Sequence, residues 1–411
     1  MILLSHPTGN EFVRAALAAF DRAGMLGEFW TTVSWDSKSP IDRALPPRLR
    51  EILRRRSFAE TIRSRTHTVP VREMIRLFAG TIGITSRHET GSFSVDAVLR
   101  ELDRKVAERL RKIEPPQAVD SVYAYEDGAL ESFRAARERG FKRIYDLPIA
   151  FWQTTQRLLR EEAERYPDWE PTLGATRDSD EKLSRKAQEL EFAQFVVCPS
   201  KFVLESLPAA ARAQKQCVIA PFGSPIVDVN RHGKKNSGRL KVLFAGALTQ
   251  RKGLADLFEA MKLVDSNQIE LVVMGSLLRP LSWYRERFAD FVYQTPRPHG
   301  EVLRLMQNCD VFVLPSIVEG RALVQQEAMA CGLPVIATKN AGADDVIVDG
   351  ETGFLVPIRS PKAIAEKLNW CAANGSVVDG MGIAARKRAA EFTWHAYGES
   401  IVAAVRALTH E

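Results

Sequence analysis

The sequence predicts an α/β protein made of two doubly wound domains, each built on a parallel sheet. Short apolar runs alternate with segments of helical periodicity, as in KVLFAG followed by GLADLFEAMKLV, and this alternation is typical of βαβ units. It occurs in two blocks, which are separated by a Pro-, Gly-, Asn- and Lys-rich seam with the composition of a linker, CVIAPFGSPIVDVNRHGKKNSGR. A chain of 411 residues is long enough for two hydrophobic cores.

The first domain is expected over residues 1–220. Its strands are predicted from four short apolar runs, MILLS, SVYAYED, KRIYDLP and QFVVCPS. A long helical insertion is expected to interrupt them around residues 41–113. Ligands of doubly wound sheets bind beyond the carboxyl ends of the strands, so polar residues that directly follow these runs are candidate site residues.

The second domain is expected over residues 221–390. Its strands are predicted from the runs KVLFAG, IELVVMG, DVFVLPS and PVIAT, which helix-length amphipathic segments separate. A C-terminal helix over residues 391–411 is expected to pack back on the first domain. Two doubly wound domains that face each other would form a ligand cleft between them.

The composition is typical of a globular protein without a membrane-spanning helix. Hydrophobic residues make up 45% of the chain and charged residues 26%, and no run reaches 18 consecutive apolar residues. The opening MILLSHPTGN has too few apolar residues for a signal peptide. Five cysteines lie mostly within or beside apolar runs, without metal-ligand spacing: Cys198, Cys217, Cys309, Cys331 and Cys371. These features predict a cytoplasmic protein with reduced thiols.

The net charge of +6 is unevenly spread, with seven arginines between residues 48 and 65. The pattern LREILRRRSF puts Leu49, Ile52 and Leu53 on one helical stripe beside arginines, which is the arrangement of a helix at an anionic membrane surface. The same pattern also fits a helix that packs on its own domain and leaves its arginines in solvent. We find no nucleic-acid-binding motif and expect no nucleic-acid partner.

A basic turn follows the first strand of the second domain, in FAGALTQRKGL. Gly246 permits close approach of a ligand to the backbone, and the helix that follows Lys252 and Gly253 offers free N–H groups. Arg251 and Lys252 add positive charge suited to phosphate oxygens. An ordinary strand-to-helix turn with a basic tip would have the same pattern.

Two glutamates lie eight positions apart in PSIVEGRALVQQEAMACGLPVIAT. A helix that starts at Gly320 would place Glu319 and Glu327 on roughly one face, where they could accept hydrogen bonds from hydroxyl groups. An isolated pair of this kind is most often a helix-start acid and a surface acid. Together with the basic turn, the pair predicts a ligand that carries both hydroxyls and a diphosphate, such as a nucleotide sugar.

These motifs resemble the family 4 retaining glycosyltransferases, or glycosyl transferases group 1, which have the GT-B fold. The resemblance is close across the second half, from FAGALTQRKG through MGSLL, HGEVLRLMQNCDVFVLPS, VEGRALVQQEAMACGLPVIAT and AGADDVIVDGETGFLV to FTWHAYGESIV. The first half matches more loosely, through HPTGN, VYAYEDGALESFRAARERGFKRIYDLP and FVVCPSKFVLESL.

The resemblance implies two Rossmann-like domains facing a central cleft. It also implies transfer of a sugar from a nucleotide-diphosphate sugar to an acceptor hydroxyl, with retention of configuration and in polysaccharide or glycoconjugate synthesis. The nucleotide sugar is a co-substrate, and no further cofactor is expected. No D-x-D pair stands in a setting suited to a divalent ion, so we expect metal-independent chemistry.

The resemblance also assigns roles in donor binding. Glu319 matches the glutamate that contacts the donor sugar, Glu327 matches the one that binds the ribose hydroxyls, and Lys252 matches the diphosphate lysine. The family's usual arginine after the glycine is replaced here by Ala247, and we expect Arg251 to substitute for it. Glu319, Lys252 and Arg251 are therefore the catalytic candidates. Residues 295–298 fall where the family holds the base, and the remaining donor-site candidates are Gly246, Gly275, Ser276, Gly320, Arg321, Ala322 and Leu323, the last four through their backbone amides.

In the first domain, SHPTGN resembles the glycine loop that approaches the donor phosphate, which makes His6, Thr8, Gly9 and Asn10 candidates. Many relatives carry a histidine after a central strand, whereas this chain has Leu147 and Pro148 there. Three acids at strand ends are expected to face the cleft and orient the acceptor: Glu126, Asp127 and Asp146. Asp127 could instead be a helix N-cap. His88 lies in a segment that could be an acceptor loop or a helix cap.

Two other functions use the same fold. One is a sugar phosphorylase or nucleotide-sugar hydrolase, in which phosphate or water replaces the acceptor. The other is a binding subunit without catalytic activity, which Ala247 and the missing histidine favour. Glu319, Glu327 and Lys252 favour an enzyme.

Overall fold

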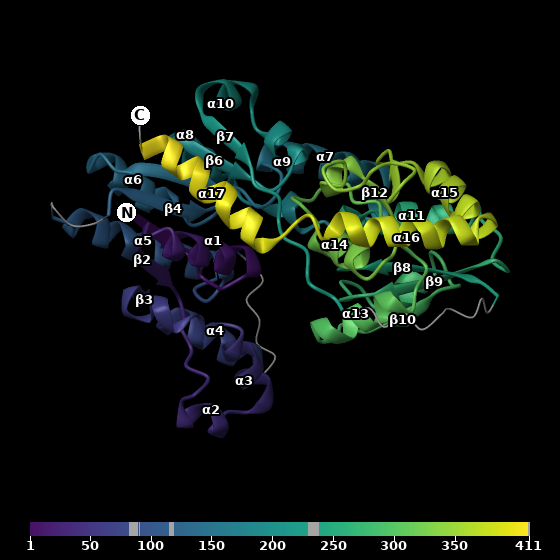
Figure 1. Cartoon of the computed structure of the whole chain (residues 1–411), viewed down its shortest axis with the longest axis horizontal. Coiled ribbons are helices and arrows are strands. Elements are labelled where there is room, and N and C mark those ends of the chain that lie inside the picture. The colour runs from purple at the N-terminus through teal and green to yellow at the C-terminus, as the bar shows by residue number, and fades with distance from the viewer. Residues whose placement is uncertain (82–88, 90, 115–118, 229–237, 410–411) are drawn as a thin grey trace.

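The computed structural model describes residues 1–81, 89, 91–114, 119–228 and 238–409, and it contains two parallel sheets (Figure 1). The first sheet has seven strands in the order β3-β2-β1-β4-β5-β6-β7. They are β1 (Ile2–Ser5), β2 (Leu26–Thr31), β3 (Thr66–Thr68), β4 (Ser121–Tyr125), β5 (Lys142–Asp146), β6 (Phe195–Cys198) and β7 (Gln216–Ile219). The strand order reverses between β1 and β4, which is where doubly wound sheets bind ligands.

The second sheet has six strands in the order β10-β9-β8-β11-β12-β13, with its reversal between β8 and β11. They are β8 (Leu240–Ala245), β9 (Ile269–Met274), β10 (Val292–Gln294), β11 (Val311–Leu314), β12 (Val335–Thr338) and β13 (Gly353–Val356). Its central strands are buried on both faces, because helices cover both sides, and this is why they read as unbroken apolar runs.

Helices cover the first sheet on both faces. Helix α1 forms because its apolar residues recur at helical spacing and are buried against the sheet. The helices of this half are α1 (Glu11–Arg22), α2 (Pro40–Ala44), α3 (Pro47–Arg54), α4 (Val71–Thr81), α5 (Val95–Lys112), α6 (Leu130–Glu138), α8 (Asp180–Phe192), α9 (Lys201–Ser206) and α10 (Ala209–Gln214). Figure 1 shows α2, α3 and α4 below the rest of this half.

Residues 41–113 are not wholly the helical insertion that the sequence predicts. Strand β3 pairs in parallel with β2 and forms the edge of the sheet, and α5 packs against α6 and the sheet. A strand of three residues, Thr-His-Thr, has no apolar run by which it could be recognised. Only the helices α2, α3 and α4 lie apart from the sheet (Figure 1).

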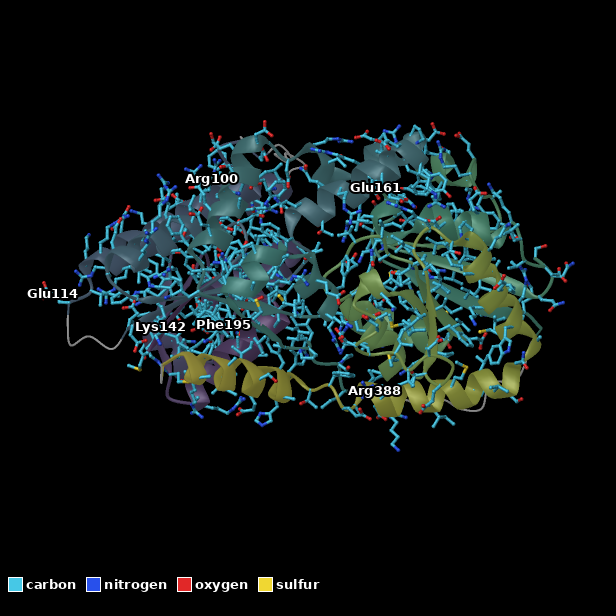
Figure 2. The ribbon with its side chains drawn as sticks, turned by 90° about the horizontal axis from the view of Figure 1, so that it is seen from above. Arg100, Glu114, Lys142, Glu161, Phe195 and Arg388 are labelled. Atoms are coloured by element: carbon cyan, nitrogen blue, oxygen red, sulfur yellow. The ribbon has the colours of Figure 1, made fainter. Side chains whose placement is uncertain are left out.

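One segment of the first half packs on the second. It comprises α7 (Trp152–Arg165) and two 3₁₀ turns, η2 (Pro167–Thr172) and η3 (Gly174–Arg177). Trp169 is buried in the core of the second half, where its ring contacts Phe258 and Tyr284. In Figure 2, Glu161 of α7 lies over the second half, well apart from Phe195 of the first sheet. We call residues 152–177 the crossing segment.

The helices of the second half are α11 (Leu254–Met261), α12 (Leu281–Arg285), α13 (His299–Gln307), α14 (Leu323–Ala330), α15 (Pro361–Ala373) and α16 (Gly375–Ala389). The last helix, α17 (Trp394–Thr409), returns to the first half and lies along α1 (Figure 1). A Cβ on Gly398 would lie 2.6 Å from the Cβ of Ala19, so the two helices approach closely at this glycine. Among the described residues, no helix is both long and apolar enough to cross a membrane.

Candidate active site

Two loops meet at the strand-order reversal of the second sheet. One contains η4 (Gln250–Lys252) and follows β8, and the other covers residues 315–322 and follows β11. Gly253 has a φ of 74°, and a Cβ there would lie 2.0 Å from the carbonyl oxygen of Pro315. Only glycine fits this turn, because it permits both the left-handed conformation and the close approach. The amide of Ile317 donates to the carbonyl of Arg251 at 2.9 Å, which joins the loops a second time.

The three catalytic candidates lie together on these loops. One carboxylate oxygen of Glu319, Oε1, lies 2.5 Å from Nζ of Lys252 and 2.6 Å from Nη1 of Arg251. Burial lowers the pKa of Lys252, Glu319 opposes that shift, and Arg251 adds to it. Two cations share one carboxylate, so this Glu319 cluster has an excess of positive charge suited to an anionic group.

Glycines bring the backbone close beneath this cluster. Gly246 has a φ of 154° and Gly275 a φ of 151°, and a Cβ on Gly275 would lie 1.7 Å from the carbonyl oxygen of Gly246. The side chain of Lys252 passes over Gly246, with Cε 3.6 Å from where a Cβ would be. The turns after β8 and β9 thus pack against each other, and Ser276 is exposed beside them.

Glu327 lies apart from Glu319, on α14. That helix begins at Leu323, so Glu319 belongs to the preceding loop, and the expectation that one helix face carries both glutamates is wrong. Glu327 pairs with Nε2 of His299 at 3.1 Å, and this hydrogen bond raises the pKa of His299, with a smaller effect from Glu11. His299 begins α13, directly after residues 295–298. The sequence reasoning missed it, although a histidine at the start of a helix beside the predicted base-binding stretch was a usable signal.

The loop between the two glutamates contacts the first half of the chain. Ser200 Oγ donates to the carbonyl of Gly320 at 2.6 Å, and a Cβ on Gly320 would lie 1.8 Å from the carbonyl oxygen of Pro148. The amide of Ala322 donates to the carbonyl of Ala341 at 3.1 Å. It is therefore engaged within the protein, contrary to the expectation that it faces the donor. Leu323 is partly buried and packs on the core of the first half.

The side chain of Arg321 points away from the Glu319 cluster. It is buried, donates from Nε to Oε1 of Gln326 at 2.9 Å, and lies over the ring of Phe392 with its guanidinium carbon 4.8 Å from the centroid. Burial lowers its pKa to about 10. Gln326 donates in turn to the carbonyl of Phe222, so Arg321 belongs to the junction where the chain passes between the two halves.

The crossing segment holds η4 in place. Gln250 is fully buried, and its Nε2 donates to Glu162 Oε2 at 2.6 Å and to Asp256 Oδ2 at 2.8 Å. Thr249 Oγ1 donates to the carbonyl of Thr172 at 2.7 Å, and the amide of Gln250 donates to Thr172 Oγ1 at 3.2 Å. The sequence did not predict a role for Glu162 or Thr172, the two residues of the crossing segment that make these bonds. Nothing in the sequence marks them as partners of a loop some 80 positions away.

The loop after β1 lies at the switch point of the first sheet. His6 is buried, with its ring edge-on to Tyr125 at 4.7 Å between centroids, and burial lowers its pKa to about 4. Its Nδ1 contacts both the carbonyl oxygen and the amide of Thr8, so the ring shapes the loop. Gly9 accepts from Nε of Arg14 at 2.8 Å, and Asn10 lies at the start of α1.

The three strand-end acids, which were expected to face the cleft, are engaged with other side chains of the first half. Asp146 is 1% exposed and accepts from the hydroxyl of Tyr123 at 2.5 Å, and burial raises its pKa to about 7. Glu126 and Asp127 lie 3.4 and 3.5 Å from Nζ of Lys186, and burial raises the pKa of Glu126 to about 7.

Asp127 is not a helix N-cap either. Helix α6 begins at Leu130, and Ala129 occupies the cap position. The Asp127 carboxylate lies 3.1 Å from Nη2 of Arg185. His88 lies outside the described residues. No group of three or more His, Cys, Asp or Glu side chains in the described ranges is arranged to hold a metal ion.

Comparison with known proteins identifies the second half. Residues 228–388 match the family model of glycosyl transferases group 1. An uncharacterized glycosyltransferase from Methanocaldococcus jannaschii is 27% identical over 53% of this chain and 59% of its own length. A D-inositol 3-phosphate glycosyltransferase from Corynebacterium diphtheriae is 39% identical over 29% of this chain and 26% of its own. The matches thus span less than two thirds of the length of these relatives.

Solved structures match the whole chain. Sucrose-phosphate synthase from Thermosynechococcus elongatus has a TM-score of 0.68 at 19% identity, with 100% of this chain and 99% of that one covered. The Anabaena protein HepE, solved in complex with UDP and glucose, has a TM-score of 0.60 at 15% identity, with 99% of both chains covered. At these identities the likeness shows the fold, which is GT-B.

Proposed function

We propose that the chain, of which residues 228–388 match the family model of glycosyl transferases group 1, is a retaining glycosyltransferase that moves a sugar from a nucleotide-diphosphate sugar to an acceptor hydroxyl. The observation that carries this proposal is the Glu319 cluster. It sets two cations and a carboxylate on adjoining loops at the switch point of the second sheet, where a diphosphate and a sugar hydroxyl can be held together.

In the proposed reaction, the bond between the sugar C1 and the diphosphate oxygen breaks while the acceptor oxygen bonds to C1 on the same face. The departing phosphate oxygen takes the acceptor proton. Lys252 and Arg251 stabilise the charge that develops on the diphosphate, so the proposed mechanism uses no metal ion. Glu319 orients the two cations and accepts a hydrogen bond from the donor sugar.

The nucleoside end of the donor would lie along α14 and α13. Glu327 would accept from the ribose hydroxyls, and His299 would hold its carboxylate in place. The loop of His6, Thr8, Gly9 and Asn10 would approach the donor phosphate from the first half. The pKa of His299 is raised in part by Glu11, which places the start of α1 within electrostatic reach of this region and supports the arrangement.

The named relatives suggest a biological setting. They include a capsular polysaccharide biosynthesis glycosyltransferase of Staphylococcus aureus, 33% identical over 35% of this chain and 40% of its own, and the D-inositol 3-phosphate enzyme. We propose cytoplasmic polysaccharide or glycoconjugate synthesis. The donor's base and sugar stay open, and a UDP-sugar is the first to test, given the UDP bound in the Anabaena structure.

Release of nucleotide diphosphate from a panel of UDP-, GDP- and ADP-sugars tests the function. We expect release from one donor, with faster release when an acceptor is added, and loss of release in Lys252→Ala. Phosphate-dependent release of a sugar phosphate would indicate a phosphorylase, and release that no acceptor accelerates would indicate a hydrolase. A protein that binds a nucleotide diphosphate but turns over none of these donors would be a binding subunit.

We further propose that the first half touches an anionic membrane surface, through α4 rather than α3. In α3, Leu49, Ile52 and Leu53 pack into a small core with Val33 and Leu77, as expected for a helix that packs on its own domain. In α4, Val71 is 68% exposed and Ile75, one turn later, is 43% exposed. Exposed apolar residues one turn apart on a helix suit a helix that lies in a lipid interface.

Co-sedimentation with anionic liposomes at low salt tests this contact. We expect wild-type protein in the pellet and a several-fold smaller bound fraction for Val71→Ser/Ile75→Ser. Arg55→Ala serves as the control, since Arg55 is exposed on α3 and pairs with Glu51. Wild-type protein that stays in the supernatant would refute the contact.

A further inference from the structure

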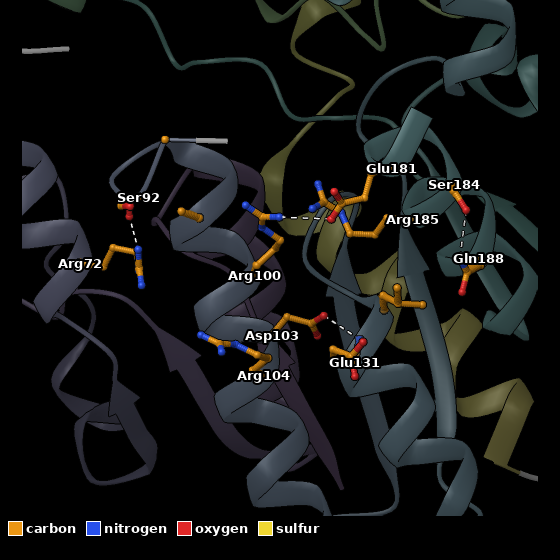
Figure 3. Close-up of a pocket in the computed structure, with 13 residues that line it drawn as sticks. Arg72, Ser92, Arg100, Asp103, Arg104, Glu131, Glu181, Ser184, Arg185 and Gln188 are labelled. Atoms are coloured by element: carbon orange, nitrogen blue, oxygen red, sulfur yellow. Dashed lines mark hydrogen bonds and ion pairs between the residues drawn. The ribbon is translucent and has the colours of Figure 1, made fainter. Parts of the chain in front are cut away.

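A cavity of about 610 Å³ lies on the first half of the chain, between the N-terminal halves of α5 and α8 and the first turn of α6 (Figure 3). Its walls share no residue with the Glu319 cluster. The volume is in the range of small-molecule sites, which is roughly 300–1,000 Å³. Nothing in the proposed glycosyl transfer uses this cavity.

Four arginines line the cavity, and they differ in how far their charge is already compensated. Arg185 pairs with Asp96 at 3.0 Å and Asp127 at 3.1 Å, and Arg72 lies 3.4 Å from Glu101. Arg100 has a looser partner, Glu181 at 3.6 Å. Arg104 has no carboxylate within ion-pair distance in the described part of the chain. Arg104 therefore carries uncompensated positive charge, and its loose pair with Glu181 leaves Arg100 able to contact a second anion.

The acids of the cavity wall are compensated within the protein. Asp103 accepts from the amides of Glu131 at 2.7 Å and Ser132 at 2.9 Å, so its charge is used at the N-terminus of α6. Glu131 pairs with Arg134 at 2.8 Å. Two of the three acids in the cavity wall are thus engaged within the protein, and the third, Glu181, is the loose partner of Arg100.

Arg100 and Arg104 lie one turn apart on α5 and line the same cavity, as Figure 3 shows. Side chains at this spacing are neighbours on the helix surface, so both guanidinium groups can donate to one phosphate. Polar groups that suit hydroxyls lie opposite, on α8: the carboxylate of Glu181 and the hydroxyl of Ser184.

We propose that this cavity binds a sugar or polyol that carries a phosphate group. Arg100 and Arg104 hold the phosphate, and Glu181 and Ser184 hydrogen-bond the hydroxyls. The proposal concerns binding alone, so it stands or falls independently of the proposed transferase activity.

Isothermal titration calorimetry on the full chain tests the proposal, with glucose 1-phosphate, glucose 6-phosphate and myo-inositol 1-phosphate as probes and glucose as the neutral control. We expect at least one phosphate to bind, no binding of glucose, and at least a tenfold weaker affinity in Arg100→Ala/Arg104→Ala. Lys105→Ala is the matched control on the same helix, because Lys105 pairs with Glu108 and does not line the cavity.

A second control separates this cavity from the Glu319 cluster, which could also attract a phosphate. Lys252→Ala should leave the affinity of the sugar phosphate unchanged. If binding is lost in Lys252→Ala and kept in the double arginine variant, the anion binds at the Glu319 cluster and the proposal is wrong. Equal binding of glucose, or no binding of any of the three phosphates at millimolar concentration, would also overturn it.

Discussion

At the switch point of the second sheet, Lys252 and Arg251 converge on Glu319, so two cations share one carboxylate. Near the switch point of the first sheet, Asp146 and Glu126 are also acids at strand ends, but each is engaged within its own half. Asp146 accepts from the hydroxyl of Tyr123, and Glu126 lies 3.4 Å from Nζ of Lys186. Similar positions in two similar folds therefore serve different purposes. One group keeps an excess of positive charge, and the other is paired inside the first half.

The largest expected effect comes from removing a cation of the Glu319 cluster. Lys252→Ala should lower the rate of sugar transfer by roughly 100- to 1,000-fold, because one of two groups that stabilise the departing diphosphate is lost. Steady-state kinetics with the active donor measures it. Lys262→Ala is the control, since Lys262 lies exposed on the same half and pairs with Glu259. Transfer at the wild-type rate in Lys252→Ala would show that the cluster is structural, like the acids of the first sheet.

The two glutamates of the second half should separate in their effects. Glu327→Ala is expected to weaken binding of the bare nucleotide diphosphate by roughly tenfold, since a charged hydrogen bond contributes about 1.5–3 kcal/mol. Glu319→Ala should keep that binding, because Lys252 and Arg251 remain free to contact the diphosphate, and should lose turnover. Calorimetry with the nucleotide diphosphate, beside transfer kinetics, measures both. Equal losses of binding in the two variants would contradict separate roles.

The donor-side residues could be predicted because they lie in short contiguous motifs after strands, where spacing and residue type agree. In the structure Glu319, Arg251 and Lys252 lie together, and their roles in donor binding stay a prediction. The GT-B fold, predicted from the alternation of strands and helices, is confirmed by structures that match the whole chain. Glu162 could not be found this way, because TTQRLLREEAER carries several similar charges and its partner Gln250 is distant in the chain. Whether Asp146 points outward or inward depends on Tyr123 and on burial, neither of which a strand-end position reveals.

The crossing segment offers a test of how the loops at the second switch point are held. Thr172→Val removes the oxygen that accepts from the amide of Gln250, and a buried amide without a partner costs about 1–3 kcal/mol. We expect a several-fold fall in kcat for transfer, as η4 loses its orientation. Thr176→Val is the matched control, because among the described residues the Thr176 hydroxyl bonds to the carbonyl of Leu173, within the crossing segment. If the two variants have equal kcat, the crossing segment supports the fold without positioning Lys252.

The smallest expected effect is on the stability of the fold rather than on activity, and it concerns Asp146 of the first sheet. The pKa of Asp146 is raised to about 7 by burial, while an exposed aspartate titrates near 3.8. Between these values the folded protein holds a proton that the unfolded chain has lost, so this residue's contribution to stability falls as pH rises from about 4 to 7 and is constant above that. Asp146→Asn lacks the titration and can still accept from the hydroxyl of Tyr123. Urea midpoints measured at pH 5 and pH 7.5 should therefore differ between wild type and Asp146→Asn, with the variant gaining relative stability at the higher pH. A difference in midpoint that is the same at both pH values would mean that Asp146 is ionised in the folded protein. The contrast between this buried acid of the first sheet and the Glu319 cluster of the second would then lose its clearest support.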